Sequence, residues 1–129
     1  MKEVEKKAKK FLKDRGWDKL KPADLAKSVS IESGELLELF QWSNQELAVV
    51  KADKEKVLEI KKELGDVFLY CTYMCVSLGL DVKKVILEKL DTATKKYPPH
   101  VVKNKGDKEP GTEDFYHHIK KTYRRSGQS

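Results

Sequence analysis

The sequence has few of the residues on which metal sites and disulfide frameworks of small proteins usually depend. Among its 129 residues are two cysteines, Cys71 and Cys75, four positions apart in an apolar stretch. Without a second cysteine pair a four-thiolate zinc site is excluded, and we expect both thiols to pack or stay reduced. The three histidines are His100, His117 and His118. A metal site earlier in the chain must therefore use oxygen ligands.

Long apolar runs and strand-like alternation are also missing. The longest apolar run, residues 67–80, is 14 residues long and too short to span a bilayer. The N-terminus is basic but no apolar stretch follows it, so we expect no secretory leader, no membrane anchor and a cytoplasmic location. Apolar residues recur instead with the helical period, which predicts an all-α protein.

Start and stop signals divide the chain into four main helices. Pro22 suits a first helical turn, Asp53 and Asp81 suit N-caps, and Gly16 and Gly79 suit helix ends. The expected helices cover residues 2–15, about 22 to about 50, 53–77 and 81–96. This pattern predicts a helical bundle with two long central helices and shorter flanking helices.

One domain is expected, over residues 1–98. Residues 99–129 are expected to form a linker and a basic C-terminal tail, which could include a short helix. Lysine and arginine outnumber acidic residues by 27 to 21, which gives a net charge of +6. This excess favours anionic ligands such as phosphates, nucleotides or nucleic acid.

Two of the expected helices carry a pair of acidic residues within an apolar face. Glu32 and Glu35 lie about 60° apart around the second helix, in an arc that they share with leucines. Glu63 and Asp66 repeat this spacing in the third helix, whereas Glu38 lies further round toward solvent. The sequence therefore predicts that two helices each present two carboxylates inward.

Four carboxylates brought together repel one another unless a cation joins them. Oxygen ligands alone favour Mg²⁺, with Mn²⁺ as an alternative, over Zn²⁺. A di-iron bundle would need Glu-x-x-His motifs, which neither helix contains. Acidic pairs at this spacing also occur on solvated helix faces, and from the residues alone that interpretation stays open.

Three stretches resemble a known family. SIESGELLELFQW, KKELGDVFLY and EKLDTATKKYP are similar to all-α nucleoside triphosphate pyrophosphohydrolases of the MazG-like type, near the dCTP pyrophosphatase branch. The resemblance covers residues 3–98. The family signature is Glu-Glu-x-x-Glu followed by Glu-x-x-Asp, and this chain has residues 31–35 and 63–66 at those places, with Ile31 replacing the first glutamate.

The resemblance implies a Mg²⁺-dependent enzyme that cleaves the α–β phosphoanhydride of a nucleoside triphosphate and releases the monophosphate and pyrophosphate. The resemblance favours a house-cleaning enzyme whose substrates are pyrimidine deoxynucleotides, such as dCTP or modified forms. It also implies a homodimer or homotetramer in which the substrate lies between subunits. No membrane is expected as a partner, and nucleic acid is expected only under the alternative described below.

The resemblance also assigns roles to residues. The implied metal ligands are Glu32, Glu35, Glu63 and Asp66. Glu35 is expected to orient the attacking water as well, and Glu38 is a second candidate base although its helical angle turns it from the ligand face. The implied substrate contacts are Trp17, Trp42, Lys89, Lys96 and Tyr97.

Two further departures from the family leave alternatives open. Ala93 stands where relatives carry an asparagine, and Lys21 and Pro22 lie in a segment that is one residue shorter than usual. The general base, the nucleotide and the choice between dimer and tetramer therefore stay open. The competing interpretations are a nucleic-acid-binding helical module that uses the basic tail, residues 112–129, and a catalytically inactive relative of the family.

Overall fold

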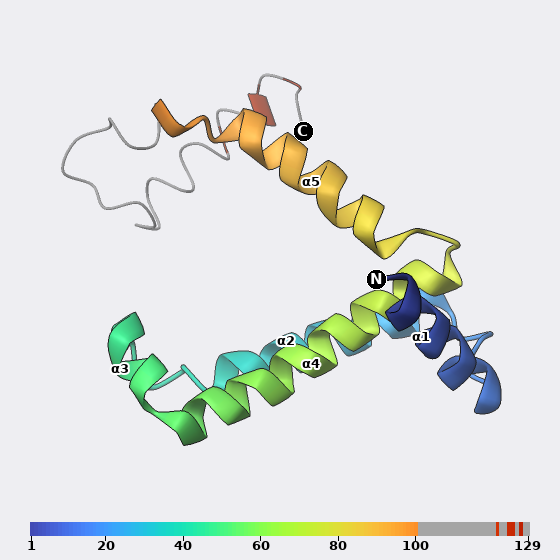
Figure 1. Ribbon diagram of the computed structural model, residues 1–129, viewed down its shortest axis with the longest axis horizontal. Helices are drawn as coiled ribbons and strands as arrows, with labels where there is room; N and C mark the ends of the chain where they lie inside the picture. The colour runs from blue at the N-terminus through green and yellow to red at the C-terminus, as the bar shows by residue number, and fades with distance from the viewer. Residues whose placement is uncertain (101–120, 122–123, 126, 128–129) are drawn as a thin grey trace. The chain divides into compact units, whose positions relative to one another are not determined.

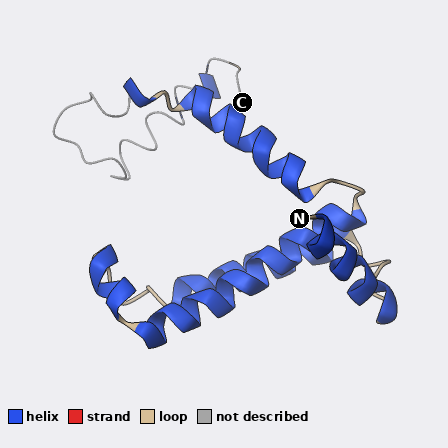
Figure 2. Ribbon diagram, in the orientation of Figure 1, coloured by secondary structure: helices blue, strands red, loops and turns tan. Residues whose placement is uncertain are grey.

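The regular structure of the described residues is entirely helical. The computed structural model describes residues 1–100, 121, 124–125 and 127 (Figure 2). Its helices are α1 (Lys2–Asp14), α2 (Pro22–Glu38), α3 (Leu47–Ala52), α4 (Lys54–Ser77) and α5 (Val82–Lys96). The all-α prediction is confirmed for this part of the chain. Most of the expected linker and tail lies outside it.

The chain divides into two units, Met1–Lys83 and Lys84–Ser129. In the first unit, α2 and α4 lie side by side and run antiparallel, and α1 packs against α4 near the C-terminal end of that helix (Figure 1). The second unit contains nearly all of α5. The expected domain limit at residues 98 and 99 stays a prediction.

A small aromatic and aliphatic core holds α1, α2 and α4 together. Its buried residues are Ala8, Leu12, Leu25 and Tyr73. The ring of Phe11 stacks on that of Tyr73 with centroids 5.7 Å apart. Leu25 is the residue of α2 in this core, so α2 is anchored near its N-terminal end. The remainder of α2 extends along α4 away from that anchor.

The second helix is shorter than expected. It ends at Glu38 rather than near residue 50, and α3 begins only at Leu47. Phe40 and Ser43 donate their backbone N–H groups to carbonyls three residues earlier, at 2.9 and 3.3 Å, which tightens the chain into turns. Ser43 and Asn44 favour such turns because their side chains compete for backbone hydrogen bonds. The prediction of one continuous helix across this segment is wrong.

The other helix limits agree closely with the sequence signals. Asp53 caps α4, since its Oδ1 accepts the backbone N–H of Lys56 at 3.0 Å. Gly79, just past α4, has a φ of +71°, which glycine adopts without steric cost. Helix α5 begins directly after Asp81 and ends before Tyr97.

No single helix of the described residues is long and apolar enough to cross a membrane. Helices α4 and α5 reach that length and composition only when they are counted together as one broken span.

Replacing Asp53 by alanine tests the cap that fixes the start of α4. Asp53→Ala leaves the N–H of Lys56 without its acceptor and should lower the free energy of unfolding by about 1 kcal/mol. Asp53→Asn keeps an acceptor oxygen and should lie within a few tenths of a kcal/mol of wild type. Urea unfolding followed by circular dichroism measures both. Equal losses in the two variants would show that charge rather than capping matters here.

Candidate metal centre

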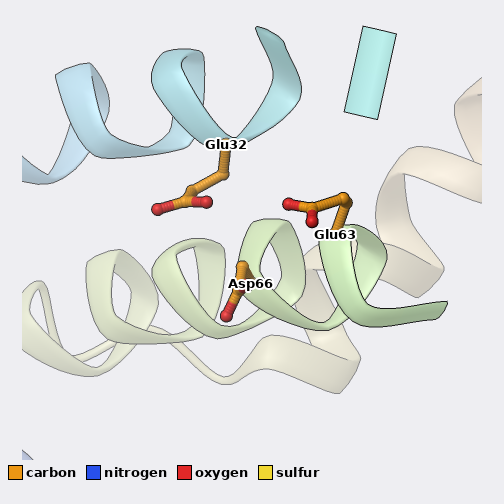
Figure 3. Close-up of side chains that lie close together, drawn as sticks. All are labelled: Glu32, Glu63 and Asp66. Atoms are coloured by element: carbon orange, nitrogen blue, oxygen red, sulfur yellow. The ribbon is translucent and has the colours of Figure 1, made fainter. Parts of the chain in front are cut away.

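Three of the four predicted carboxylates meet between α2 and α4. One oxygen from each of Glu32, Glu63 and Asp66 lies within 4.8 Å of the other two. Glu32 extends from α2, whereas Glu63 and Asp66 belong to α4 (Figure 3). All three side chains are half-buried. The structure thus places acidic oxygens from two helices close enough to share one cation.

Helical periodicity explains why these residues share the interface. Leu25, which is buried in the core, lies seven positions before Glu32 and therefore on the same face of α2. On α4, Glu63 and Asp66 alternate with Ile60 and Val67, which are also half-buried. The acids replace apolar residues in a packing stripe. That position restricts the water that can reach them.

Glu63 carries an unsatisfied oxygen. Its side chain is 14% exposed, and its Oε1 lies 3.8 Å from Nζ of Lys62, a solvent-exposed neighbour. Its Oε2 is buried and has no hydrogen-bond partner among the described residues. A buried carboxylate oxygen without a partner is costly, and a divalent cation would satisfy it. The donor set therefore fits a hard cation that takes oxygen ligands.

The pKa of Glu32 is raised above its ordinary value. Desolvation is the largest cause, followed by the charges of Glu35 and Asp66, a side-chain hydrogen bond with Glu35, and the charge of Glu63. Each of these causes disfavours the charged form of Glu32. A cation bound among these carboxylates would relieve the repulsion.

Glu35 and Glu38 lie outside the group of three oxygens. Glu35 is exposed and interacts with Glu32 of the cluster. Glu38 is the exposed last residue of α2. The ligand role of Glu35 and the catalytic roles of both residues stay predictions.

The two tryptophans are exposed rather than packed in a core. The ring of Trp17 meets that of Phe11 edge to face, with centroids 6.0 Å apart. Trp42 lies in the turns after α2 and is 90% exposed. Neither ring belongs to the carboxylate group, so their role at a base pocket stays a prediction.

The predicted phosphate and sugar contacts belong to the second unit. Lys89 and Lys96 lie on α5, and Tyr97 follows it. Nζ of Lys96 lies 5.6 Å from the ring centroid of Tyr97. Their contact with a nucleotide stays a prediction, as does any role of tail residues 112–129, nearly all of which lie outside the described residues.

Sequence reasoning missed Lys56. Its ammonium donates a hydrogen bond to the backbone carbonyl of Leu39 and lies 5.4 Å from the ring centroid of Phe40. Lys56 lies seven residues before Glu63, so the two share a face of α4. That spacing was available in the sequence, but the partner carbonyl depends on how α2 and α4 align.

Comparison with known proteins finds a family and relatives that match most of the chain. Residues 27–113 match the sequence model of the MazG-like family. The chain is 31% identical over 94 residues to mouse dCTP pyrophosphatase 1, across 70% of this chain and 55% of the mouse protein. The human protein of the same name is 28% identical over 100 residues, across 76% of this chain and 59% of its own length. The chain thus spans little more than half of these relatives.

A solved structure supports the same relationship. The crystal structure of a pyrophosphatase from Archaeoglobus fulgidus superposes with a TM-score of 0.66 at 31% sequence identity. The match covers 76% of this chain and 92% of the archaeal chain. At this identity the similarity extends beyond a shared helical architecture.

Replacing Glu32 by glutamine tests the repulsion among the carboxylates. In EDTA at pH 7, Glu32→Gln should melt at a higher temperature than wild type, since a neutral amide removes one of the crowded charges. A raised folded-state pKa means that Glu32 favours folding below its ordinary pKa of 4.5 and loses this contribution as the pH rises through the folded value. The advantage of the variant should therefore shrink near pH 4.

Thermal melts across this pH range measure the effect. Glu59→Gln is the matched control because Glu59 is an exposed α4 carboxylate outside the cluster. A Glu32→Gln chain that melts below wild type at pH 7, while Glu59→Gln does not, would contradict the repulsion.

Proposed function

The chain belongs to the MazG-like family, and we propose that it is a divalent-cation-dependent nucleoside triphosphate pyrophosphohydrolase. It would cleave the α–β phosphoanhydride and release a nucleoside monophosphate and pyrophosphate. The observation that carries this proposal is the meeting of Glu32, Glu63 and Asp66 in a chain with pyrophosphatase relatives. Sequence similarity suggests the reaction, and the carboxylate cluster supplies a site suited to it.

The cation is Mg²⁺, with Mn²⁺ as a substitute. Glu32, Glu63 and Asp66 would hold it, and Glu35 would join them, a role that its interaction with Glu32 supports. Only oxygen donors are present, which is the ligand set of these hard ions. When bound, such an ion neutralises negative charge that builds up on phosphate oxygens in the transition state.

The proton of the attacking water needs an acceptor on this chain. Glu35 is exposed on the solvent side of the cluster, so its carboxylate can orient water toward the α-phosphorus and take its proton. Glu38 lies three residues further along α2 and is the second candidate. Lys89 and Lys96 would hold phosphate oxygens as point charges.

The substrate is a pyrimidine deoxynucleoside triphosphate, such as dCTP or a modified form. The mouse and human relatives are named as dCTP pyrophosphatases, which supports this class. The exposed rings of Trp17 and Trp42 offer apolar faces on which a base could stack. In Trp42 nearly the whole ring is free to do so.

The chain acts as a homodimer or homotetramer. Within residues 1–100 five hydrophobic residues are buried, which is few for a segment of that length. By contrast Ile31 is 60% exposed and Phe68 is 64% exposed, on α2 and α4 respectively. Both lie within two residues of a carboxylate of the cluster. A second copy covering these side chains would border the metal site and line the space for substrate.

Replacing one cluster carboxylate tests the activity. Pyrophosphate release from a panel of ordinary and modified nucleoside triphosphates, with Mg²⁺ and with EDTA, should show turnover only with the metal. Glu63→Gln should lower kcat/KM roughly 100- to 1000-fold, the scale of losing one electrostatic stabiliser of the transition state. Glu59→Gln should match wild type. If Glu63→Gln turned over substrate within a factor of two of wild type, the cluster would have no role in the reaction.

Sedimentation tests the assembly. Analytical ultracentrifugation of wild type should give at least twice the 14.9 kDa chain mass. Phe68→Asp should shift the distribution toward monomer because it places a charge in the covered face. Lys61→Asp, an exposed change on the same helix, should sediment as wild type. A wild-type chain that sediments as a monomer at micromolar concentration would contradict the oligomer.

A further inference from the structure

Among the described residues, Lys56 makes the only side-chain hydrogen bond that joins α4 to the end of α2. Its ammonium donates to the carbonyl of Leu39, the C-cap of α2, and lies over the ring of Phe40. The side chain is half-buried, and no carboxylate of the described residues pairs with it. Its backbone N–H is fixed by Asp53, so the residue that carries the ammonium is itself held in place.

The C-terminal end of α2 needs a positive charge that the helix does not supply. The last turn of α2 contains no basic residue, and it ends on Glu38. Its final carbonyls form the negative end of the helix dipole, where an acidic residue is unfavourable and a lysine is favourable. Lys56 provides that lysine from the neighbouring helix, as lysines near a helix end commonly do within their own helix.

The Lys56 contact and the carboxylate cluster share one register. Leu39 follows Glu32 by seven residues on α2, and Lys56 precedes Glu63 by seven residues on the antiparallel α4. Each interval is two helical turns, or about 10 Å. The hydrogen bond and the cluster are therefore two contacts on the same seam between the helices. Because an ammonium has no lone pair, Lys56 cannot itself ligate a cation held by Glu63.

We propose that Lys56 is a positioning residue, whose hold on the carbonyl of Leu39 fixes α2 against α4 and so sets the spacing between Glu32 and the carboxylates of Glu63 and Asp66. The proposal rests on the proposed function, because it concerns the cation affinity of that cluster. Without Lys56 the last turns of α2 would fray, and Glu32 and Glu35 would lose their fixed distance from α4. The core around Leu25 would still anchor the other end of α2.

Cation affinity without nucleotide is the test, since it separates positioning from a direct contact with substrate. Free Mn²⁺, followed by electron paramagnetic resonance, is titrated with the full chain as wild type and three variants, Lys56→Met, Lys56→Arg and Lys61→Met. Lys61 is an exposed lysine of the same helix and gives the matched control. We expect Lys56→Met to bind Mn²⁺ roughly 10-fold more weakly, the usual scale for residues that orient ligands. Arginine should restore most of the affinity, and Lys61→Met should match wild type.

Hydrogen exchange in EDTA gives a second readout that needs no metal. Backbone amides of residues 32–40 should exchange faster in Lys56→Met than in Lys61→Met, whereas those of α1 should be unchanged. If Lys56→Met does not fold, Phe40→Leu carries the test, because it removes the ring under the ammonium and should weaken Mn²⁺ binding about threefold.

Three outcomes would overturn the proposal. Lys56→Met affinity within twofold of wild type, with unchanged exchange, overturns it alone while the proposed function stands. Unchanged Mn²⁺ binding in Phe40→Leu does the same where that variant replaces Lys56→Met. A wild-type chain that neither binds Mn²⁺ nor releases pyrophosphate overturns it together with the proposed function, and exchange of residues 32–40 then still reports whether Lys56 holds α2.

Discussion

The crowding of three carboxylates into the seam between α2 and α4 is the constraint on which the rest of the structure depends. Like charges at this spacing oppose the packing of the two helices, and the buried oxygen of Glu63 adds a desolvation cost. The helices stay together because Leu25 and Tyr73 pack at one end of the seam and Lys56 bonds to Leu39 at the other. The three carboxylates lie between these two contacts, which hold them close together against their mutual repulsion.

The small hydrophobic core limits the stabilising energy that a single chain has to offset the repulsion among the carboxylates. Few side chains are fully buried, whereas large apolar residues of α2 and α4 are exposed beside the acids. A second copy over these residues would add the burial that the lone chain lacks, at about 25 cal/mol for each Å² of apolar surface covered. The contact between copies would then both stabilise the fold and enclose the proposed metal site.

The sequence predicted those parts of the site that depend on helical periodicity. The spacing of Glu63 and Asp66 is local to one helix, so their shared face could be derived without the fold. Glu35 obeys the same spacing from Glu32 but is exposed, because which side of the acidic pair meets α4 depends on how the two helices pack. The end of α2 at Glu38 was missed since apolar residues continue into the turns. Lys56 could not be predicted, because its partner is set by the register of two separate helices.

Ile31 narrows the choice of base in the proposed reaction. It replaces the first glutamate of the family signature, and its exposed side chain can neither accept a proton nor ligate a cation. In the proposed reaction the proton would then pass to another carboxylate, and Glu35 is an exposed one that interacts with Glu32. The neighbouring carboxylates raise the pKa of Glu32, so a proton is favoured there in the absence of a cation. A cation bound there would compete with that proton and would leave Glu35 as the carboxylate that could accept the proton of water.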